Sequence, residues 1–534
     1  MRRHPVAFVA FEEQDNLGIG YLASSLMAEN FDVRIVDFRL REEKILQFLL
    51  PIDPLLVGFS IIFQHHIQRF AEVIGRLRAG GLTCHFCSGG HYPSLRPEEL
   101  LAFIPELDSV VLFEGEHTLL DLVRCLAERG EWRSIKGIAH REGGRVRVNP
   151  LRPLERDLDL FPPPARLPLR EYAFGRKFAT LLAGRGCVNH CSFCSIREFY
   201  SRPPGPVKRV RRPEMVVSEM ELLYERKNCS IFMFQDDDFP VACDSGRLWA
   251  TRFCDQLAKK RLHNKILWKI NCRPDEVDSG LFSQMKAHGL FLVYLGIESG
   301  NDQGLRLMNK RFSPQANFAA VKLLNELEIL YDYGFMLFDP ESSFQSVEEN
   351  LDFLVELCGD GSSPVTFCKM LPYAGTRIER MLKEEGRLRG GPASVDYDFN
   401  DPSLDDLYEW MAECFSDWIG ERDGVLNLAR WIRYHIAVFR RFFPVDERFM
   451  ALERSVRSVI RDSNLFLIDT ARSLSRHCRN KSVRRSPHRL EAVRETVTRR
   501  HHEYRDSLSR LLDEIEDMAH QSGKRSWSAR NGPG

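Results

Sequence analysis

Cys187, Cys191 and Cys194 lie within eight residues of one another, and this triplet constrains the fold more than any other feature of the chain. Three thiolates on one short loop can bind one face of a cubane iron–sulfur cluster. Such clusters are normally held by four cysteines, so a set of three leaves one iron open to another ligand. A zinc site, which usually needs a fourth ligand such as His190, and unrelated core thiols are the alternative interpretations.

The size and charge of the chain set its broad class. Its 534 residues predict about two to four domains. The 75 Lys and Arg residues balance the 75 Asp and Glu residues, so no global charge favours nucleic acid or an anionic membrane. No secretory signal precedes the apolar run Val6–Phe11, and no apolar run reaches the ~18 residues of a membrane span. We therefore expect a cytoplasmic protein with reduced thiols, no nucleic-acid partner and no membrane span.

Residues 1–150 alternate short β-rich runs with helical stretches. This rhythm predicts an α/β domain with a doubly wound, Rossmann-like parallel sheet. Ligands of such sheets bind beyond the carboxyl ends of the strands. Glycines and polar side chains close or follow three of the predicted strands, and the candidate binding residues there are Gly58, Ser60, Gly89, Gly90, Glu114 and Gly115.

A second α/β domain follows a proline-rich linker at residues 151–176. Residues 177–400 contain six predicted strands with helices between them, which indicates a partial (β/α)6 barrel. The strands are Phe178–Ala183, Ser230–Phe234, Leu267–Asn271, Phe291–Gly296, Asp332–Leu337 and Val365–Lys369. Barrel sites use the loops at the strand carboxyl ends, and the cysteine triplet directly follows the first strand.

The spacing CxxxCxxC, with aromatic Phe193 before the last cysteine, resembles the radical SAM enzymes. The resemblance implies that Cys187, Cys191 and Cys194 hold a [4Fe-4S] cluster whose open iron binds S-adenosylmethionine (SAM). An electron from the cluster then cleaves the sulfonium to give a 5′-deoxyadenosyl radical. An electron donor such as flavodoxin or ferredoxin is implied as a partner.

Residues 5 to 150 look like the cobalamin-binding domain that precedes many radical SAM domains. The matching fragments are Gly18 to Leu22, Val57 to Ser60, Gly89 to Pro93 with Pro97 to Glu99, and Glu114 to Thr118. The resemblance implies that cobalamin binds at these strand ends. A generic Rossmann-like domain with ordinary turn glycines is the alternative. No histidine is assigned as the lower cobalt ligand, since His65, His66 and His91 favour loop or turn roles.

The same resemblance implies residues that contact SAM at the barrel mouth. Asp236 and Asp237 are candidates for the methionine amino group, because carboxylates accept charge-assisted hydrogen bonds from an ammonium. Arg273 is a candidate for the cofactor carboxylate. Glu298 and Ser299 are candidates for the ribose or methionine part. The alternatives are a helix-capping acidic turn for the two aspartates and a structural salt bridge for Arg273.

Residues 401–520 carry apolar residues at helical spacing and are rich in aromatic side chains. We expect a helical C-terminal domain that packs on the open barrel, either to shape a substrate pocket or only to cover the barrel. Residues 521–534 are polar and are expected to be a disordered tail.

The function implied by the resemblance is a cobalamin-dependent radical SAM methyltransferase. Such an enzyme moves a methyl group from methylcobalamin to an unactivated carbon of a small-molecule or peptide substrate, often in a natural-product, lipid or pigment pathway. An oxidative cyclase or ring-rearranging enzyme with the same cofactors is the first alternative, and a non-catalytic cobalamin or cluster sensor is another. A methylthiotransferase is disfavoured, because no second cysteine triad is visible. No catalytic side chain is assigned.

Overall fold

The computed structural model describes residues 4–11, 16–62, 64–479 and 487–530. Its N-terminal domain is built on a parallel sheet in the order β2-β1-β3-β4-β5. These strands are β1 (Val6–Ala10), β2 (Val33–Asp37), β3 (Leu56–Ser60), β4 (His85–Gly89) and β5 (Ser109–Val111). The doubly wound sheet predicted by the sequence is confirmed.

Helices cover both faces of this sheet because successive strand residues point to opposite sides. On one face Phe8 and Val111 pack among apolar residues of α1 (Leu17–Ala28) and α6 (Glu116–Ala127). Three helices cover the other face, namely α2 (Glu42–Leu49), α3 (Ile67–Ala79) and α5 (Pro97–Phe103). The short helix α4 (His91–Leu95) directly follows β4. The hairpin of β6 (Ile138–Glu142) and β7 (Arg145–Val148), which the sequence analysis does not predict, extends the sheet beyond β5.

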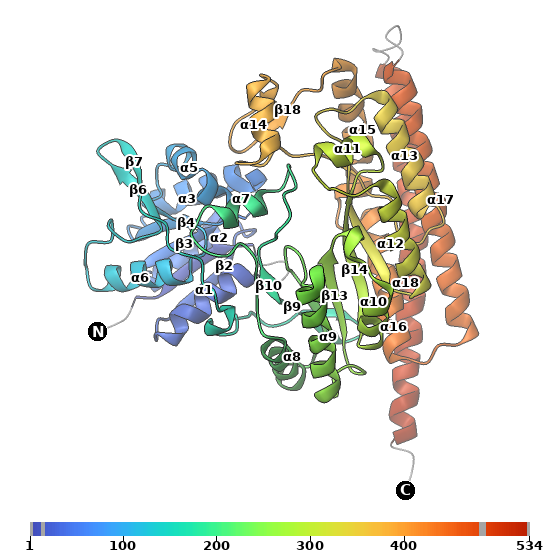
Figure 1. Cartoon of the computed structure of the whole chain (residues 1–534), viewed down its shortest axis with the longest axis horizontal. Helices are drawn as coiled ribbons and strands as arrows, with labels where there is room; N and C mark the ends of the chain where they lie inside the picture. Colours follow the sequence, from blue (N-terminus) through green and yellow to red (C-terminus); the bar gives the residue numbers. More distant parts are fainter. Residues whose placement is uncertain (1–3, 12–15, 63, 480–486, 531–534) are drawn as a thin grey trace.

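The second domain contains six parallel strands, as predicted for a partial barrel. They are β9 (Arg176–Leu181), β12 (Cys229–Phe234), β13 (Leu267–Cys272), β14 (Leu290–Glu298), β15 (Leu330–Phe338) and β16 (Cys368–Lys369), with β8 (Glu171–Ala173) antiparallel at the edge. The connecting helices are α8 (Pro213–Lys227), α9 (Cys243–Lys259), α10 (Ser279–Ala287), α11 (Asp302–Leu307), α12 (Pro314–Glu326) and α13 (Phe344–Cys358). Figure 1 shows this barrel between the N-terminal domain and the C-terminal helices.

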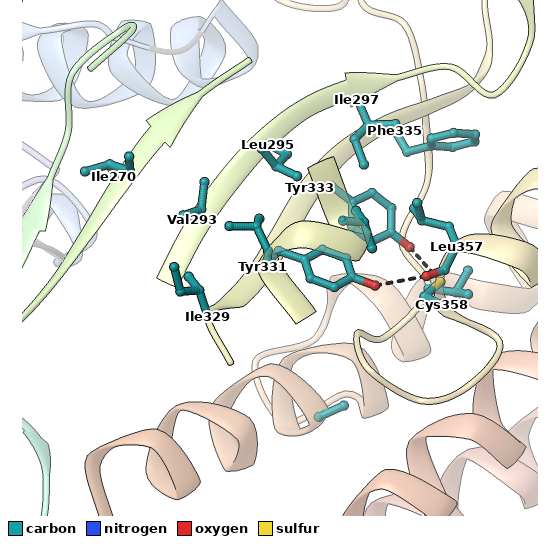
Figure 2. Packing of buried hydrophobic residues seen from close by; sticks show 14 of the residues in the cluster. Ile270, Val293, Leu295, Ile297, Ile329, Tyr331, Tyr333, Phe335, Leu357 and Cys358 are labelled. Atoms are coloured by element: carbon teal, nitrogen blue, oxygen red, sulfur yellow. Dashed lines mark hydrogen bonds between the residues drawn. The ribbon is translucent and has the colours of Figure 1, made fainter. Parts of the chain in front are cut away.

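The barrel strands bury one face against their helices and turn the other face to the barrel interior. Val293, Leu295 and Ile297 of β14 belong to the buried cluster, and Figure 2 shows them on the same side as residues of β15 near α13. On that side the Tyr331 hydroxyl donates to the carbonyl oxygen of Leu357 at 3.0 Å. By strand alternation, Tyr294, Gly296 and Glu298 face the interior.

The C-terminal helices close one side of the barrel. They are α15 (Pro402–Gly420), α16 (Val425–Phe442), α17 (Glu447–Arg479) and α18 (Pro487–Arg530). The Arg433 guanidinium of α16 pairs with Asp332 of β15 at 2.9 Å, with both side chains buried. Helix α18 continues through residues 521–530, where the sequence analysis expects disorder, and residues 531–534 lie outside the described part. Among the described residues, no helix is both long enough and apolar enough to cross a membrane.

Candidate functional site

A cavity of about 550 Å³ lies between the N-terminal domain and the barrel. This size falls within the usual range of ligand pockets. Its N-terminal wall contains all six residues predicted at the strand ends, which are Gly58, Ser60, Gly89, Gly90, Glu114 and Gly115. Its barrel wall includes Arg185, Gln235 and Asp237, which lie beside or opposite the cysteine loop. The cavity thus brings one face of the Rossmann-like sheet against the barrel mouth.

Two glycines keep the backbone of this cavity in place. Gly90 has φ +121°, and a Cβ there would lie 2.4 Å from the carbonyl oxygen of Ile61. A Cβ at Gly58 would lie 2.9 Å from the ring of Phe8, which itself lines the cavity. Both positions therefore require glycine. The cavity lining beside strands β1, β3 and β4 includes Phe8, Gly58 and Cys87. Such apolar and glycine residues fit the apolar parts of a large cofactor such as cobalamin.

A buried ion-pair network joins the two domains at the cavity wall. The Arg185 guanidinium lies 3.2 Å from a Glu114 oxygen and 2.6 Å from a Glu116 oxygen. Arg209 contributes a second guanidinium, 2.9 Å from the other oxygen of Glu114. Burial alone would raise the pKa of Glu114, but Arg185 and Arg209 lower it below its ordinary value. Glu114 therefore forms ion pairs between the two domains and also lines the cavity.

The cysteine loop follows β10 (Gly184–Arg185) and ends at α7 (Ser195–Ser201), for which Cys194 is the N-cap residue. The carboxylate of Asp238 lies 3.7 Å from the Cys187 sulfur, and the backbone N–H of Asn189 donates to that sulfur at 3.4 Å. Burial raises the pKa of Cys187 to about 11 and that of Cys194 to about 12. The loop is also held by a hydrogen bond from the backbone N–H of Ser192 to the carbonyl oxygen of Met308, at 3.1 Å.

The donor set of this loop fits an iron–sulfur cluster. All fourteen cysteines lie in the described part of the chain and are free thiols. Cys191 and Cys187 both raise the pKa of Cys194 further, after the effect of burial, so the three thiols lie within electrostatic reach of one another. In the described residues, no three Cys, His, Asp or Glu side chains converge closely enough to hold a metal ion. Sulfur is nevertheless the donor that such clusters take.

The two predicted aspartates support the cysteine loop. Asp236 is buried, and its carboxylate accepts hydrogen bonds from the backbone N–H groups of Ala183 at 3.0 Å and Gly184 at 2.6 Å. Asp237 accepts from the backbone N–H of Gly186 at 2.9 Å and also lines the cavity. These contacts are structural. The predicted cofactor contact of Asp236 is not supported by its geometry, because both carboxylate oxygens already face backbone amides.

Arg273 and Ser299 are also occupied by protein contacts. Arg273 forms a bidentate pair with Asp275, and its guanidinium also donates to the carbonyl oxygen of Lys310. The structural salt bridge, which was the alternative for this residue, is therefore present. Ser299 is fully buried, and its hydroxyl lies 3.3 Å from Asn350 of α13. Its side chain thus faces the helix layer and not the barrel interior.

Glu298 faces the interior of the barrel. Its carboxylate lies 3.2 Å from the Lys310 ammonium, and both side chains are largely buried. A Cβ at Gly296 or at Gly334 would lie 3.0 Å from a Glu298 oxygen, so these two paired glycines leave the room that the carboxylate occupies. Glu298 also has φ +66°, a strained conformation for a non-glycine residue. The geometry keeps Glu298 available as a polar group of the site.

Several site residues are absent from the sequence-based candidates. Arg185 and Arg209 pair with the other domain, and Lys269, Asn271 and Tyr294 face the barrel interior. The alternation of apolar and polar residues in Leu267–Cys272 was a signal for the last group, since polar residues at every second position must share one face. The ion pairs of the two arginines span distant parts of the chain, and no local pattern indicates them.

Comparison with known families agrees with this architecture. Residues 3–123 match the family described as B12 binding domain. Residues 181–354 match the Radical SAM superfamily. The first match covers the sheet that carries the predicted strand-end glycines. The second begins at the last residue of β9 and covers the cysteine loop and the four strands β12, β13, β14 and β15. The two matched segments are those that enclose the cavity.

Named relatives match about two thirds of the chain. An uncharacterized methyltransferase of Pyrococcus horikoshii is 29% identical over 374 residues, which is 68% of this chain and 77% of that protein. An anaerobic magnesium-protoporphyrin IX monomethyl ester cyclase of Rubrivivax gelatinosus is 27% identical over 62% of this chain, and the match spans 60% of the cyclase. A hopanoid C-3 methylase of Methylococcus capsulatus is 26% identical over 68% of each protein.

Solved structures share the fold over most of the chain. The cobalamin-dependent SAM radical enzyme OxsB, solved with aqua-cobalamin, aligns with 96% of this chain and 84% of its own, with a TM-score of 0.66 at 17% identity. The radical SAM methyltransferase TsrM of Kitasatospora setae aligns with 89% of this chain and 100% of its own, with a TM-score of 0.62 at 16% identity. With the two domain matches and the cavity between those domains, the chain belongs to the cobalamin-binding radical SAM enzymes.

Proposed function

We propose that this protein is a methyltransferase that moves a methyl group to an unactivated carbon of a small-molecule substrate. The observation that carries the proposal is the cavity shared by the two domains, because it places the predicted cobalamin-binding residues against the loop that leads into the cysteine triplet. Relatives named as methyltransferase or methylase support this choice. The electron donor, such as flavodoxin or ferredoxin, and the cytoplasmic location are parts of the same proposal.

The residues of the chain bind and orient the reacting groups. Cys187, Cys191 and Cys194 would hold the cluster, and the strand-end glycines would admit the corrin ring. When bound, the cluster with SAM supplies a radical that removes a hydrogen atom, and the corrinoid supplies the methyl group. Tyr21 and Phe113 give the cavity apolar walls that exclude water.

The test uses anaerobically purified protein loaded with iron, sulfide and hydroxocobalamin. SAM and a chemical reductant are added, and the products are analysed by mass spectrometry. We expect 5′-deoxyadenosine and S-adenosylhomocysteine from the native chain and no deoxyadenosine from Cys191→Ala. Cys243→Ala is the matched control, because this cysteine is exposed at the start of α9 and should not affect the products. A well-folded, cluster-loaded protein that forms no deoxyadenosine and binds no corrinoid would contradict the proposal.

A second function is supported by the relatives named as magnesium-protoporphyrin IX monomethyl ester cyclases. A cyclase would use the same two domains without net methyl transfer. Once a substrate is identified, the mass of the product distinguishes the two functions. A gain of one methylene group supports the methyltransferase, whereas a loss of hydrogen or an unchanged mass supports cyclisation or rearrangement.

A further inference from the structure

Lys269 is a lysine on a barrel strand whose side chain faces the barrel interior. Lys269 is the third residue of β13, and strand alternation turns it to the same side as Asn271. The neighbouring residues Trp268 and Ile270 are fully buried in the core on the opposite side. The Lys269 side chain therefore belongs to the barrel interior.

The surroundings of Lys269 do not neutralise its charge. Its ammonium donates to the side-chain oxygen of Asn271 and lies 5.8 Å from the centre of the Tyr294 ring. Both are neutral groups. Within the described residues Lys269 has no ion pair with a carboxylate. Burial lowers the pKa of Lys269 to about 8, although Asp332 and Asp236 act in the opposite direction.

The nearby carboxylates are already engaged by other groups. Asp332 pairs with Arg433 at 2.9 Å and also accepts a hydrogen bond from the Tyr434 hydroxyl. Asp236 accepts from two backbone N–H groups. Glu298 pairs with Lys310 at 3.2 Å. Each of these three carboxylates thus has its own partner, and among the described residues none of them forms an ion pair with Lys269.

The interior is also accessible to a ligand. Tyr294 keeps 39% of its surface exposed, although its strand lies between β13 and β15. Gly296 and Gly334, paired across β14 and β15, carry no side chain themselves, and the Glu298 carboxylate lies next to both. In filled barrels this layer is occupied by bulky side chains. Lys269 is itself only partly buried, so a small molecule in the barrel interior can reach its side chain.

An isolated cation in a desolvated place is costly unless an anion joins it. We propose that Lys269 is an anion-binding residue, and that the substrate enters the barrel with a carboxylate or phosphate group directed at its ammonium. The neutral amide of Asn271 orients the ammonium, and the Tyr294 ring covers one side of it. The assignment rests on the proposed function, because it takes the barrel interior to be the substrate site.

The test measures binding of inorganic phosphate to the cluster-loaded, cobalamin-loaded protein by titration calorimetry. We expect Lys269→Met to weaken phosphate binding about tenfold or more, since it removes a charge-assisted hydrogen bond. Lys269→Arg keeps the charge and should retain binding. Lys265→Met is the matched control, because Lys265 is exposed just before the same strand and should bind phosphate like the native chain. Bound cobalamin, read from its absorbance, verifies that each variant is folded.

The carboxylate of SAM is the other source of an anion, and a second titration distinguishes it. If Lys269→Met weakens binding of SAM but not of decarboxylated SAM, the ammonium serves the cofactor and the substrate assignment is overturned. Equal phosphate binding by Lys269→Met and the native chain also overturns it. Formation of deoxyadenosine from SAM alone, measured on the same preparations, tests the proposed function separately from this assignment.

Discussion

Replacing Arg185 by methionine should loosen the contact between the two domains. The change removes a guanidinium that is 11% exposed and leaves Glu116, which is 6% exposed, without its partner at 2.6 Å. Removing one member of a buried ion pair typically costs about 3–5 kcal/mol, because the other charge stays buried and unpaired. Glu114 retains Arg209 at 2.9 Å, so the loss should fall near the lower end of that range.

The measurement is urea unfolding followed by tryptophan fluorescence, with Arg124→Met as the control. Arg124 pairs with Glu29 at 2.7 Å, but both side chains are 45% exposed, and such surface pairs contribute below about 1 kcal/mol. A double-mutant cycle with Glu116→Gln should give a coupling of roughly 1–3 kcal/mol. The reasoning is refuted if Arg185→Met costs no more than Arg124→Met and the cycle shows no coupling.

Three further predictions follow from the cavity and its supports. Gly90→Ala should abolish retention of hydroxocobalamin on gel filtration, because the new Cβ would lie 2.4 Å from the carbonyl oxygen of Ile61. Gly81→Ala is the control. Gly81 has φ +95° but no atom within 4 Å of its Cβ position, so this variant should retain hydroxocobalamin. The pKa of Glu114 is held low, so the stability it contributes is present above the unfolded pKa of about 4.3 and is lost as the pH falls through the lower folded value. The urea midpoints of Glu114→Gln and the native chain should accordingly converge as the pH falls from about 5 to about 2, and a constant difference would contradict this. Asp236→Asn should destabilise the chain by about 1–3 kcal/mol in the same assay, because an amide has one acceptor oxygen for two backbone donors, and an unchanged midpoint would remove its structural role.

The two sheets could be predicted from the sequence because their signals are local. Apolar runs such as Val6–Ala10 alternate with helical stretches, and this rhythm specifies parallel strands without knowledge of distant partners. The hairpin β6/β7 had an equally local signal that was not used. Gly143 and Gly144 have φ +56° and +78° and form a two-residue Gly-Gly turn between alternating strands.

The sequence predicted those residues of the site whose place depends only on the backbone position at a strand end. The strand-end glycines line the cavity because the carboxyl ends of parallel strands meet at one edge. Side-chain contacts are different, because Ser299 and Glu298 were both expected to contact the cofactor and the structure places only Glu298 in the interior, with Ser299 against α13. The pairing of β14 with β15 also shifts by a bulge between Gly296 and Glu298, and no local pattern in the sequence indicates this shift.

The position of Arg185 explains why the two cofactor sites must be considered as one structure. It lies two residues before Cys187, and its guanidinium reaches Glu114 and Glu116 of the other domain. A shift of the N-terminal domain would therefore displace Arg185 and the segment that leads into the cysteine loop. A shift of that segment would in turn move a wall of the cavity. Buried ion pairs contribute little net stability compared with apolar packing, but they favour one geometry over its alternatives. The network therefore helps to fix the position of the cavity wall relative to the segment that leads into the cysteine loop.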